Sequence, residues 1–450
     1  MNIQLWTAIE KFDFDNPADE YGFSIRLAVE NSWTIFFAKT AILEYKKFMY
    51  LAATSNEMVS PSEIVDIVWH QHLIFTNLYS DFCAILGKRI DHIPSTHNKA
   101  EFEKFQKAKE TTQKLYEINF GKQPHEFWDN SNNVFSLNLE SSNTTPKKIA
   151  QKYILGFLIM LFPFYWVVSP VLTQIDNPYF LYYYISLYAF SVFLLLQYTK
   201  NAGSKLIENL KSNFIVNNLT AFELVFFQKD QLEFVVRGVV NNLIENHRVK
   251  IVNNKLELVV EEKTDNQYEN CIIEIMKEND PMPYPQLFHT ACNKPLFEQI
   301  SKSVGNIKSV ILNSKKFLKI IKISVFVFGF LLSIGMCRIV TGLSRGKAIG
   351  LLVALMFVLV IASFAFFDKI LNDLFSKRMH SSHLQEKQNT DAQKNWEWNY
   401  FLYGNVAFVF MPLTVPFNNT SSDSSSSNSS CSSSCGSSCG SSCGGCGGGD

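Results

Sequence analysis

The sequence predicts a mainly α-helical protein with a helical N-terminal domain, four transmembrane helices in two hairpins, a winged-helix-like α+β cytoplasmic insert and a disordered tail. Three observations lead to this prediction. Long uncharged apolar stretches interrupt the 450-residue chain, its charged fraction is only 18%, and Ser, Gly and Cys dominate its last residues. Ordinary soluble domains carry roughly 25% charged residues. The 41 basic and 41 acidic side chains balance, so no overall charge steers the chain towards nucleic acid.

Residues 1–130 are expected to form the helical N-terminal domain. The stretch 23–51 is rich in helix formers and contains neither Gly nor Pro, so it predicts one long helix. A later helix should begin with Ser60 as its N-cap. Pro61 would then occupy the first helical position, and Glu63 would complete a capping box.

The helix after Ser60 carries the candidate functional residues. At about 100° per residue, Asp66 and His70 fall on one side, together with Glu63, whereas His72 falls roughly 200° from His70 on the apolar side. One straight helix therefore cannot aim both histidines at the same ion. Further metal ligands would come from four nearby residues, Asp81, Cys83, His92 and His97.

Two interpretations of this helix are open. His70 with carboxylates four and seven residues before it is a usable start for a metal site or an acid–base site. Alternatively, Trp69 and His72 anchor a hydrophobic core, and the helix has a structural role only.

This region resembles a known family. The run PSEIVDIVWHQHLIFTNLYSDFC and the following LGKRIDHIP resemble the tryptophan-His-x-His segment of glycine-rich domain-containing proteins. RLAVENSW, EYKKFMYL and LYEINFGKQPHEFW extend the likeness over most of residues 20–130. The family usually has glycines where residues 96–99 stand here. The resemblance implies a domain type and no particular chemistry. Its motif maps onto five positions, Trp69, His70, His72, Cys83 and His92.

Four apolar segments predict the two transmembrane hairpins, after a linker at residues 131–152. Residues 153–172 and 179–198 are uncharged runs of 20 residues, which at about 1.5 Å per residue cross a hydrocarbon core roughly 30 Å thick. The second hairpin, residues 323–367, pairs a shorter uncharged run with another of 20 residues. The charges of Lys322 and Arg338 would reach the interfaces from the ends of the shorter run.

The segment between the hairpins, residues 200–322, predicts a winged-helix-like unit. Thr220 and Glu223 have the spacing of a capping box, and an apolar helix should cover residues 231–246. Two short strands, 249–252 and 256–260, flank Asn253 and Asn254, a dipeptide suited to a type I′ hairpin.

A DNA-binding role is not expected for this unit. A winged helix that binds DNA needs a basic surface for the phosphates, but the second helix carries Arg237 against Glu233 and Glu245. Docking of a partner protein, or a structural role, is the expected alternative.

Residues 200–450 resemble a second family, bacterial multipass membrane proteins of unknown function with Cys/Gly-rich tails. The likeness lies in the order LTAFELVFFQ, VVRGVVNNLIENHRVKI, a span, GLSRGKAIGLL and a further span. The family tends to have a Gly-Gly turn where residues 228–230 stand here. The resemblance implies a bacterial inner membrane protein.

Lysine and arginine positions predict the membrane orientation. Basic residues flank the outer ends of both hairpins, whereas the turn at residues 173–178 has none. Arg338, Arg345 and Lys347 weaken this bias for the second hairpin without reversing it. Both termini are therefore expected in the cytoplasm, with membrane lipid as one partner.

The C-terminal part divides into a connector at residues 368–417 and a disordered tail at 418–450. Thiolates in such a tail can bind Zn(II) or Cu(I), whereas disulfides are not expected in a reducing cytoplasm. A low-complexity extension that binds nothing specific is the alternative. The tail cysteines are Cys431, Cys435, Cys439, Cys443 and Cys446.

No P-loop, dinucleotide fingerprint or nucleophile elbow stands out in the sequence. The leading hypothesis is therefore a non-enzymatic membrane scaffold whose cytoplasmic units dock partner proteins. The alternative is a metal-binding or metal-sensing membrane protein, with Zn or Cu held by Asp66 and His70 with their neighbours, by the cysteine tail, or by both.

Overall fold

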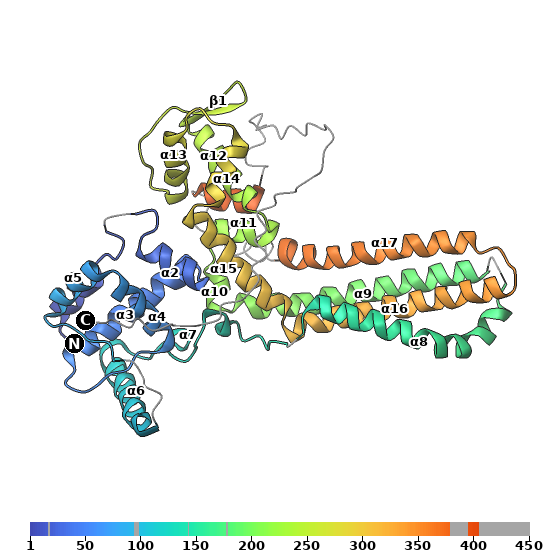
Figure 1. Cartoon of the computed structure of the whole chain (residues 1–450), viewed down its shortest axis with the longest axis horizontal. Helices are drawn as coiled ribbons and strands as arrows, with labels where there is room; N and C mark the ends of the chain where they lie inside the picture. Colours follow the sequence, from blue (N-terminus) through green and yellow to red (C-terminus); the bar gives the residue numbers. More distant parts are fainter. Residues whose placement is uncertain (17–18, 94–98, 143, 177–178, 379–394, 405–450) are drawn as a thin grey trace, which may run out of the picture.

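The computed structural model describes residues 1–450 except 17–18, 94–98, 143, 177–178, 379–394 and 405–450. The described chain is mainly helical, and its one sheet is a two-stranded hairpin. Four long helices extend to one side, while an N-terminal helical lobe and a second lobe lie at their other end (Figure 1). The prediction of a disordered tail concerns residues 418–450, which lie outside the described residues.

The N-terminal lobe consists of short helices around an aromatic core. Its largest fully buried side chains include Trp33, Tyr45, Phe48 and Phe82. Its helices are α1 (Ile3–Lys11), α2 (Phe23–Asn31), α3 (Ile35–Thr54), α4 (Glu63–Ile74), α5 (Thr76–Leu86), α6 (Lys99–Phe120), α7 (His125–Trp128) and the 3-10 helix η1 (Asn133–Leu137).

The prediction of one helix over residues 23–51 is wrong. The chain breaks between α2 and α3, where Ser32 adopts a left-handed conformation with φ of 54°. Thr34 then caps α3 by accepting a hydrogen bond from the Phe37 N–H at 3.2 Å. The break buries Trp33, which is 1% exposed, so tertiary packing overrides the helix-forming composition.

The predicted start of α4 is wrong by two residues. Ser62, not Ser60, is the N-cap, and its hydroxyl accepts from the Val65 N–H at 3.2 Å and donates to the Phe127 carbonyl at 2.6 Å. The Ser60 N–H is instead bound to the Thr112 hydroxyl of α6 at 2.8 Å. Both serines are therefore placed by distant partners that local sequence does not reveal.

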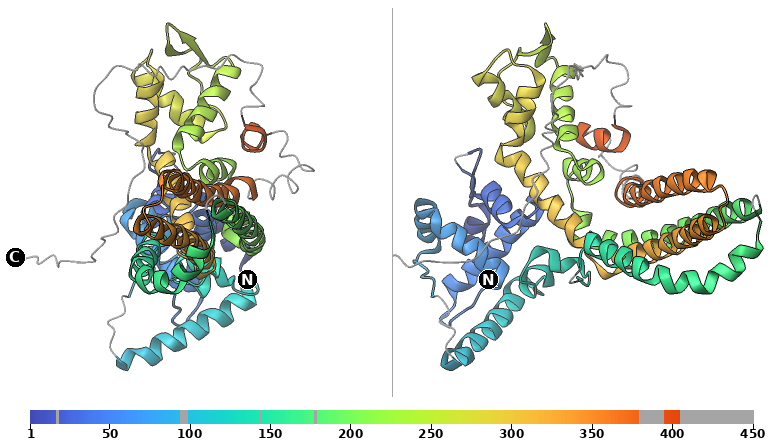
Figure 2. Two further views of the ribbon diagram at one scale, coloured as in Figure 1. Left: turned by 90° about the vertical axis from the view of Figure 1, so that its right-hand side faces the viewer. Right: turned by 45° about the vertical axis from the view of Figure 1, so that its right-hand side comes forward.

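Four helices are long and apolar enough to cross a membrane, by length and composition. They run alongside one another in each view of Figures 1 and 2 and coincide with the four predicted segments. The short third segment belongs to a helix of 30 residues that continues past both flanking charges. The four helices are α8 (Pro146–Gln174), α9 (Tyr179–Lys211), α16 (Lys315–Ser344) and α17 (Gly350–Asn372).

Two tyrosines of α9 connect this helix to its neighbours. The Tyr184 hydroxyl donates to the Leu331 carbonyl of α16 at 3.0 Å, and the Tyr188 hydroxyl donates to the Leu359 carbonyl of α17 at 2.9 Å. Both tyrosines are buried among the helices. Their hydroxyl groups thus find partners inside the bundle, where an unpaired polar group would be costly.

Arg338 closes the end of the bundle farthest from the lobes. It is 5% exposed, and its guanidinium donates to the carbonyls of Leu172 and Ile175 at the end of α8, the latter at 2.7 Å. The same group lies 4.8 Å from the ring centroid of Phe180. Arg345 donates to the Thr173 carbonyl at 3.1 Å. These two arginines therefore act as caps for the C-terminus of α8.

The second lobe contains the predicted capping box and hairpin. Thr220 and Glu223 form both hydrogen bonds of the box, and Asn253 and Asn254 have φ values of 51° and 60°, as a type I′ turn requires. The elements are α10 (Phe214–Asn217), α11 (Ala221–Lys229), α12 (Leu232–Glu245), β1 (Val249–Val252), β2 (Lys255–Leu258), α13 (Gln267–Glu278), α14 (Tyr284–Cys292), α15 (Pro295–Leu312), the π-helix η2 (Asp373–Arg378) and α19 (Trp396–Tyr403).

Direct contacts join the two lobes to each other and to the membrane helices. The Gln299 amide of α15 donates to the Trp33 carbonyl at 2.9 Å, and Lys294 pairs with Glu20 at 2.9 Å. The Lys315 N–H at the start of α16 is bound to the Glu140 carbonyl, just before α8. The N-terminal lobe is thereby held at the base of the bundle.

Candidate metal centre

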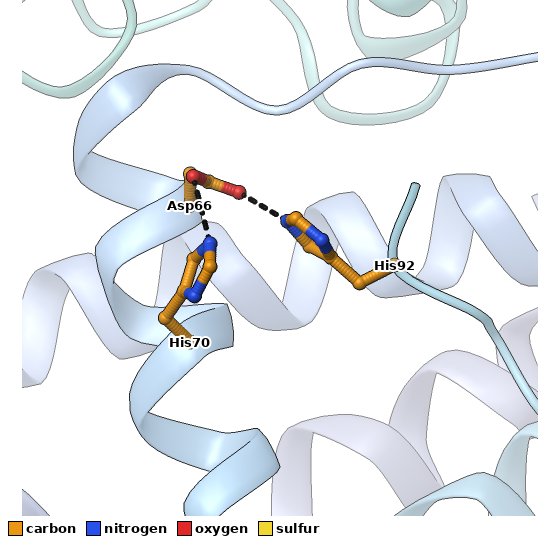
Figure 3. Close-up of side chains that lie close together, drawn as sticks. All are labelled: Asp66, His70 and His92. Atoms are coloured by element: carbon orange, nitrogen blue, oxygen red, sulfur yellow. Dashed lines mark hydrogen bonds and ion pairs between the residues drawn. The ribbon is translucent and has the colours of Figure 1, made fainter. Parts of the chain in front are cut away.

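Asp66, His70 and His92 converge on the surface of the N-terminal lobe (Figure 3). Asp66 Oδ2 lies 3.3 Å from His70 Nε2, and Asp66 Oδ1 lies 3.0 Å from His92 Nε2. One ligand atom from each of the three residues lies within 4.8 Å of the other two. Within the described parts of the chain, this is the one such group of three or more His, Cys, Asp and Glu residues.

Helix α4 positions two of these side chains through its amphipathic pattern. Ile64, Val68 and His72 are buried, whereas the side chain of His70 is 58% exposed. Asp66, one turn before His70, is 36% exposed. Packing of the apolar face fixes the rotation of the helix, and this rotation directs Asp66 and His70 outward, as the spacing predicts.

His92 reaches the site from the segment after α5. Gly87 ends α5 with φ of 76°, a conformation that glycine adopts without strain, and the chain then turns back towards α4. The Tyr79 hydroxyl donates to the Ile90 carbonyl, two residues before His92, and the Trp69 indole N–H donates to Tyr79 at 3.3 Å. The Trp69 ring packs edge-on against His92 with centroids 4.6 Å apart. Trp69 and Tyr79 are thus positioning residues for His92.

His72 belongs to the core and not to the site. It is fully buried, its Nδ1 lies 2.9 Å from the Tyr45 hydroxyl, and its ring packs against Phe14 at 4.7 Å. Burial lowers the pKa of His72 to about 4, so the imidazole is neutral in the folded protein at neutral pH. The tryptophan-His-x-His motif therefore divides its roles: Trp69 supports the site, His70 lines it and His72 fills the core.

The remaining sequence candidates do not join this group. Cys83 is buried in α5, and Asp81 is exposed on the same helix. His97 and the five tail cysteines lie outside the described residues. Sequence reasoning offered His92 as one of four alternatives and missed Tyr79, because no local pattern links Tyr79 to the Ile90 carbonyl.

The geometry suits a first-row transition metal. Ligands bound to Zn(II) at about 2.1 Å in a tetrahedron lie roughly 3.4 Å from one another. Asp66 Oδ2 lies 3.3 Å from His70 Nε2 and Asp66 Oδ1 lies 3.0 Å from His92 Nε2, so each carboxylate oxygen has one imidazole nitrogen near this separation, as in a hydrogen-bonded pair. Two imidazoles and one carboxylate also form the ligand set of many centres that keep an open coordination position.

Comparisons of the chain with protein-family models, curated proteins and solved structures find no match.

Proposed function

We propose that this membrane protein binds a divalent transition-metal ion, zinc before others, through Asp66, His70 and His92. The observation that supports this function is the meeting of three suitable ligand atoms, from two separate segments, within 4.8 Å. Imidazole nitrogen and carboxylate oxygen are the ligands that a borderline ion such as Zn(II) accepts.

An ordinary hydrogen-bonded Asp–His cluster is the competing explanation. Two features favour a metal. Both histidines present the same atom, Nε2, to one carboxylate, although they come from different elements. In addition, Trp69 and Tyr79 are both nearly buried and hold the segment that carries His92, which an incidental surface ion pair would not need.

The exposure of the ligands favours exchange of the metal over a permanent structural role. The His70 side chain is 58% exposed and that of His92 is 17% exposed, so an ion can enter from solvent. The surrounding lobe already has an extensive apolar core, so we expect it to fold without the ion. A centre of this kind is suited to sensing or to chemistry at the ion.

The membrane context extends the proposal. We place the centre in the cytoplasm of a bacterium, with both termini inside and a winged-helix-like second lobe. Lys147 and Lys315 lie at the end of the bundle that carries the lobes, which supports this orientation. At the other end, Arg338 and Arg345 donate hydrogen bonds to carbonyls at the end of α8. They therefore oppose this orientation less than free cations would.

Docking of a partner protein is a second candidate function, favoured by the β1–β2 hairpin. This hairpin projects from the second lobe in Figure 1, and Ile251, Val252 and Val259 are 39%, 39% and 52% exposed. Exposed apolar side chains on a projecting element are typical of a contact surface. A photo-crosslinking residue at position 251 should yield a discrete protein adduct in native membranes, and its absence would remove this candidate.

Substitution of His92 by alanine is expected to weaken zinc binding by more than 100-fold. Loss of a residue that only supports a ligand already costs roughly 10- to 100-fold in affinity, and loss of a ligand should cost more. Competition with a chromophoric chelator on the detergent-purified full chain measures this change. His125→Ala is the matched control, because His125 is an exposed histidine of the same lobe outside the site.

Equal affinities for the wild-type chain and the His92→Ala variant would contradict the proposed site. An equal loss in His125→Ala would show instead that the change is nonspecific. Circular dichroism of each variant establishes that the fold is retained.

A further inference from the structure

A pocket of about 440 Å³ adjoins the metal centre. Asp66 and His92 line this pocket as well as the centre. The apolar wall of the pocket consists of Phe48, Trp69 and Ile90. Ala52 of α3 contributes a small side chain, and Lys88 contributes a positively charged one. The volume lies within the roughly 300–1,000 Å³ of small-molecule sites in proteins.

The pocket and the centre are parts of one arrangement. Trp69 packs against His92 and also forms pocket wall, so the residue that positions a ligand shapes the neighbouring space. Three protein ligands leave at least one coordination position of a zinc ion open. Because two of the three ligands line the pocket, a molecule bound in it is adjacent to the ion.

The charge of the metal centre indicates which class of molecule would bind in the pocket. A divalent ion held by one carboxylate and two neutral imidazoles retains one positive charge. Three acidic residues, Glu57, Glu63 and Asp91, and the basic Lys88 also line the pocket, but all four are exposed, so solvent and salt screen their charges. An anionic oxygen donor is therefore favoured at the ion, with an apolar group behind it.

We propose that the pocket binds a small organic acid, whose anionic oxygens coordinate the metal while its apolar body contacts Phe48, Trp69 and Ile90. The proposal rests on the proposed function, since the ion supplies the strongest interaction. The anion of the acid displaces metal-bound water, and any proton that the acid still carries goes to solvent. No other bond of the acid is broken in this step.

Cobalt substitution with two hydroxamates tests the proposal on the full chain. The visible bands of Co(II) report its inner coordination sphere, and hydroxamates are bidentate oxygen donors. Benzohydroxamate and acetohydroxamate should both alter the spectrum, and benzohydroxamate should bind at least tenfold more tightly because its ring fills the pocket. Equal affinities, or no spectral change with cobalt bound, would overturn the pocket proposal and leave metal binding intact.

Two variants that fill the pocket make the test specific. Ala52→Phe should abolish the preference for benzohydroxamate while leaving Co(II) affinity and the acetohydroxamate response unchanged. Ile93→Trp acts from the rim, where Ile93 is 59% exposed, so this change does not disturb the core. Ala84→Phe, at an exposed position of α5, is the control and should retain the preference.

A preference retained in both pocket-filling variants would also overturn the proposal. If cobalt does not bind to the wild-type chain at all, the proposed function fails, and the pocket proposal fails with it.

Discussion

Replacement of Glu44 by alanine is expected to destabilise the N-terminal lobe by about 3–5 kcal/mol, the range typical of breaking a buried charged pair. The Glu44 side chain is 2% exposed and accepts three hydrogen bonds. The donors are the Tyr116 hydroxyl at 2.7 Å, the Trp128 indole N–H at 2.8 Å and the Lys47 ammonium at 2.7 Å. Alanine would leave three donors around an empty space, and at least two of these donors are buried.

Thermal unfolding followed by tryptophan fluorescence measures this effect, because Trp128 is itself one of the donors. Glu44→Gln should lose less stability, since the amide oxygen of glutamine still accepts hydrogen bonds. Arg89→Ala is the control, because the Arg89–Asp91 pair is highly exposed and such pairs contribute about 1 kcal/mol at most. A midpoint for Glu44→Ala no lower than that of Arg89→Ala would refute the role assigned to Glu44.

Replacement of Arg338 by leucine should loosen the far end of the membrane bundle by about 2–4 kcal/mol. The change removes the donors for the Leu172 and Ile175 carbonyls at the end of α8. Carbonyl groups left without a partner at the edge of the hydrocarbon region are costly. The change also removes the guanidinium from the ring of Phe180.

The stability of the Arg338→Leu variant can be measured by unfolding in mixed detergent micelles. Arg345→Leu is the matched control, since the exposed side chain of Arg345 donates to the Thr173 carbonyl at 3.1 Å. We expect the control to lose about 1 kcal/mol or less. Similar losses in the two variants would show that Arg338 is an ordinary interfacial charge.

Periodicity alone predicted two of the three residues of the candidate site, Asp66 and His70. A helix that buries Ile64 and Val68 must direct Asp66 and His70 outward and His72 inward, and the structure has these orientations. Periodicity could not single out His92 from the other candidate ligands. Its position depends on the Tyr79 hydroxyl, the Ile90 carbonyl and Trp69, which are tertiary contacts.

The difference between local contacts and tertiary contacts also explains which local predictions succeed. The Thr220 capping box has both of its partners within four residues and was predicted correctly. The cap of α4 was misplaced because Ser60 binds Thr112 and Ser62 binds Phe127. Apolar length predicted the four membrane helices, but no pattern indicated that Arg338 would cap α8. The two family resemblances and the role of the cysteine tail stay predictions.

The zinc content of the detergent-purified full chain tests the central claim most directly. Elemental analysis should find one zinc ion per chain after loading and removal of excess metal. A variant with all five tail cysteines replaced by serine should retain this ion, whereas His70→Ala combined with His92→Ala should lose it. Retention of zinc in the double-histidine variant, or its loss in the cysteine variant, would contradict a metal centre at Asp66, His70 and His92.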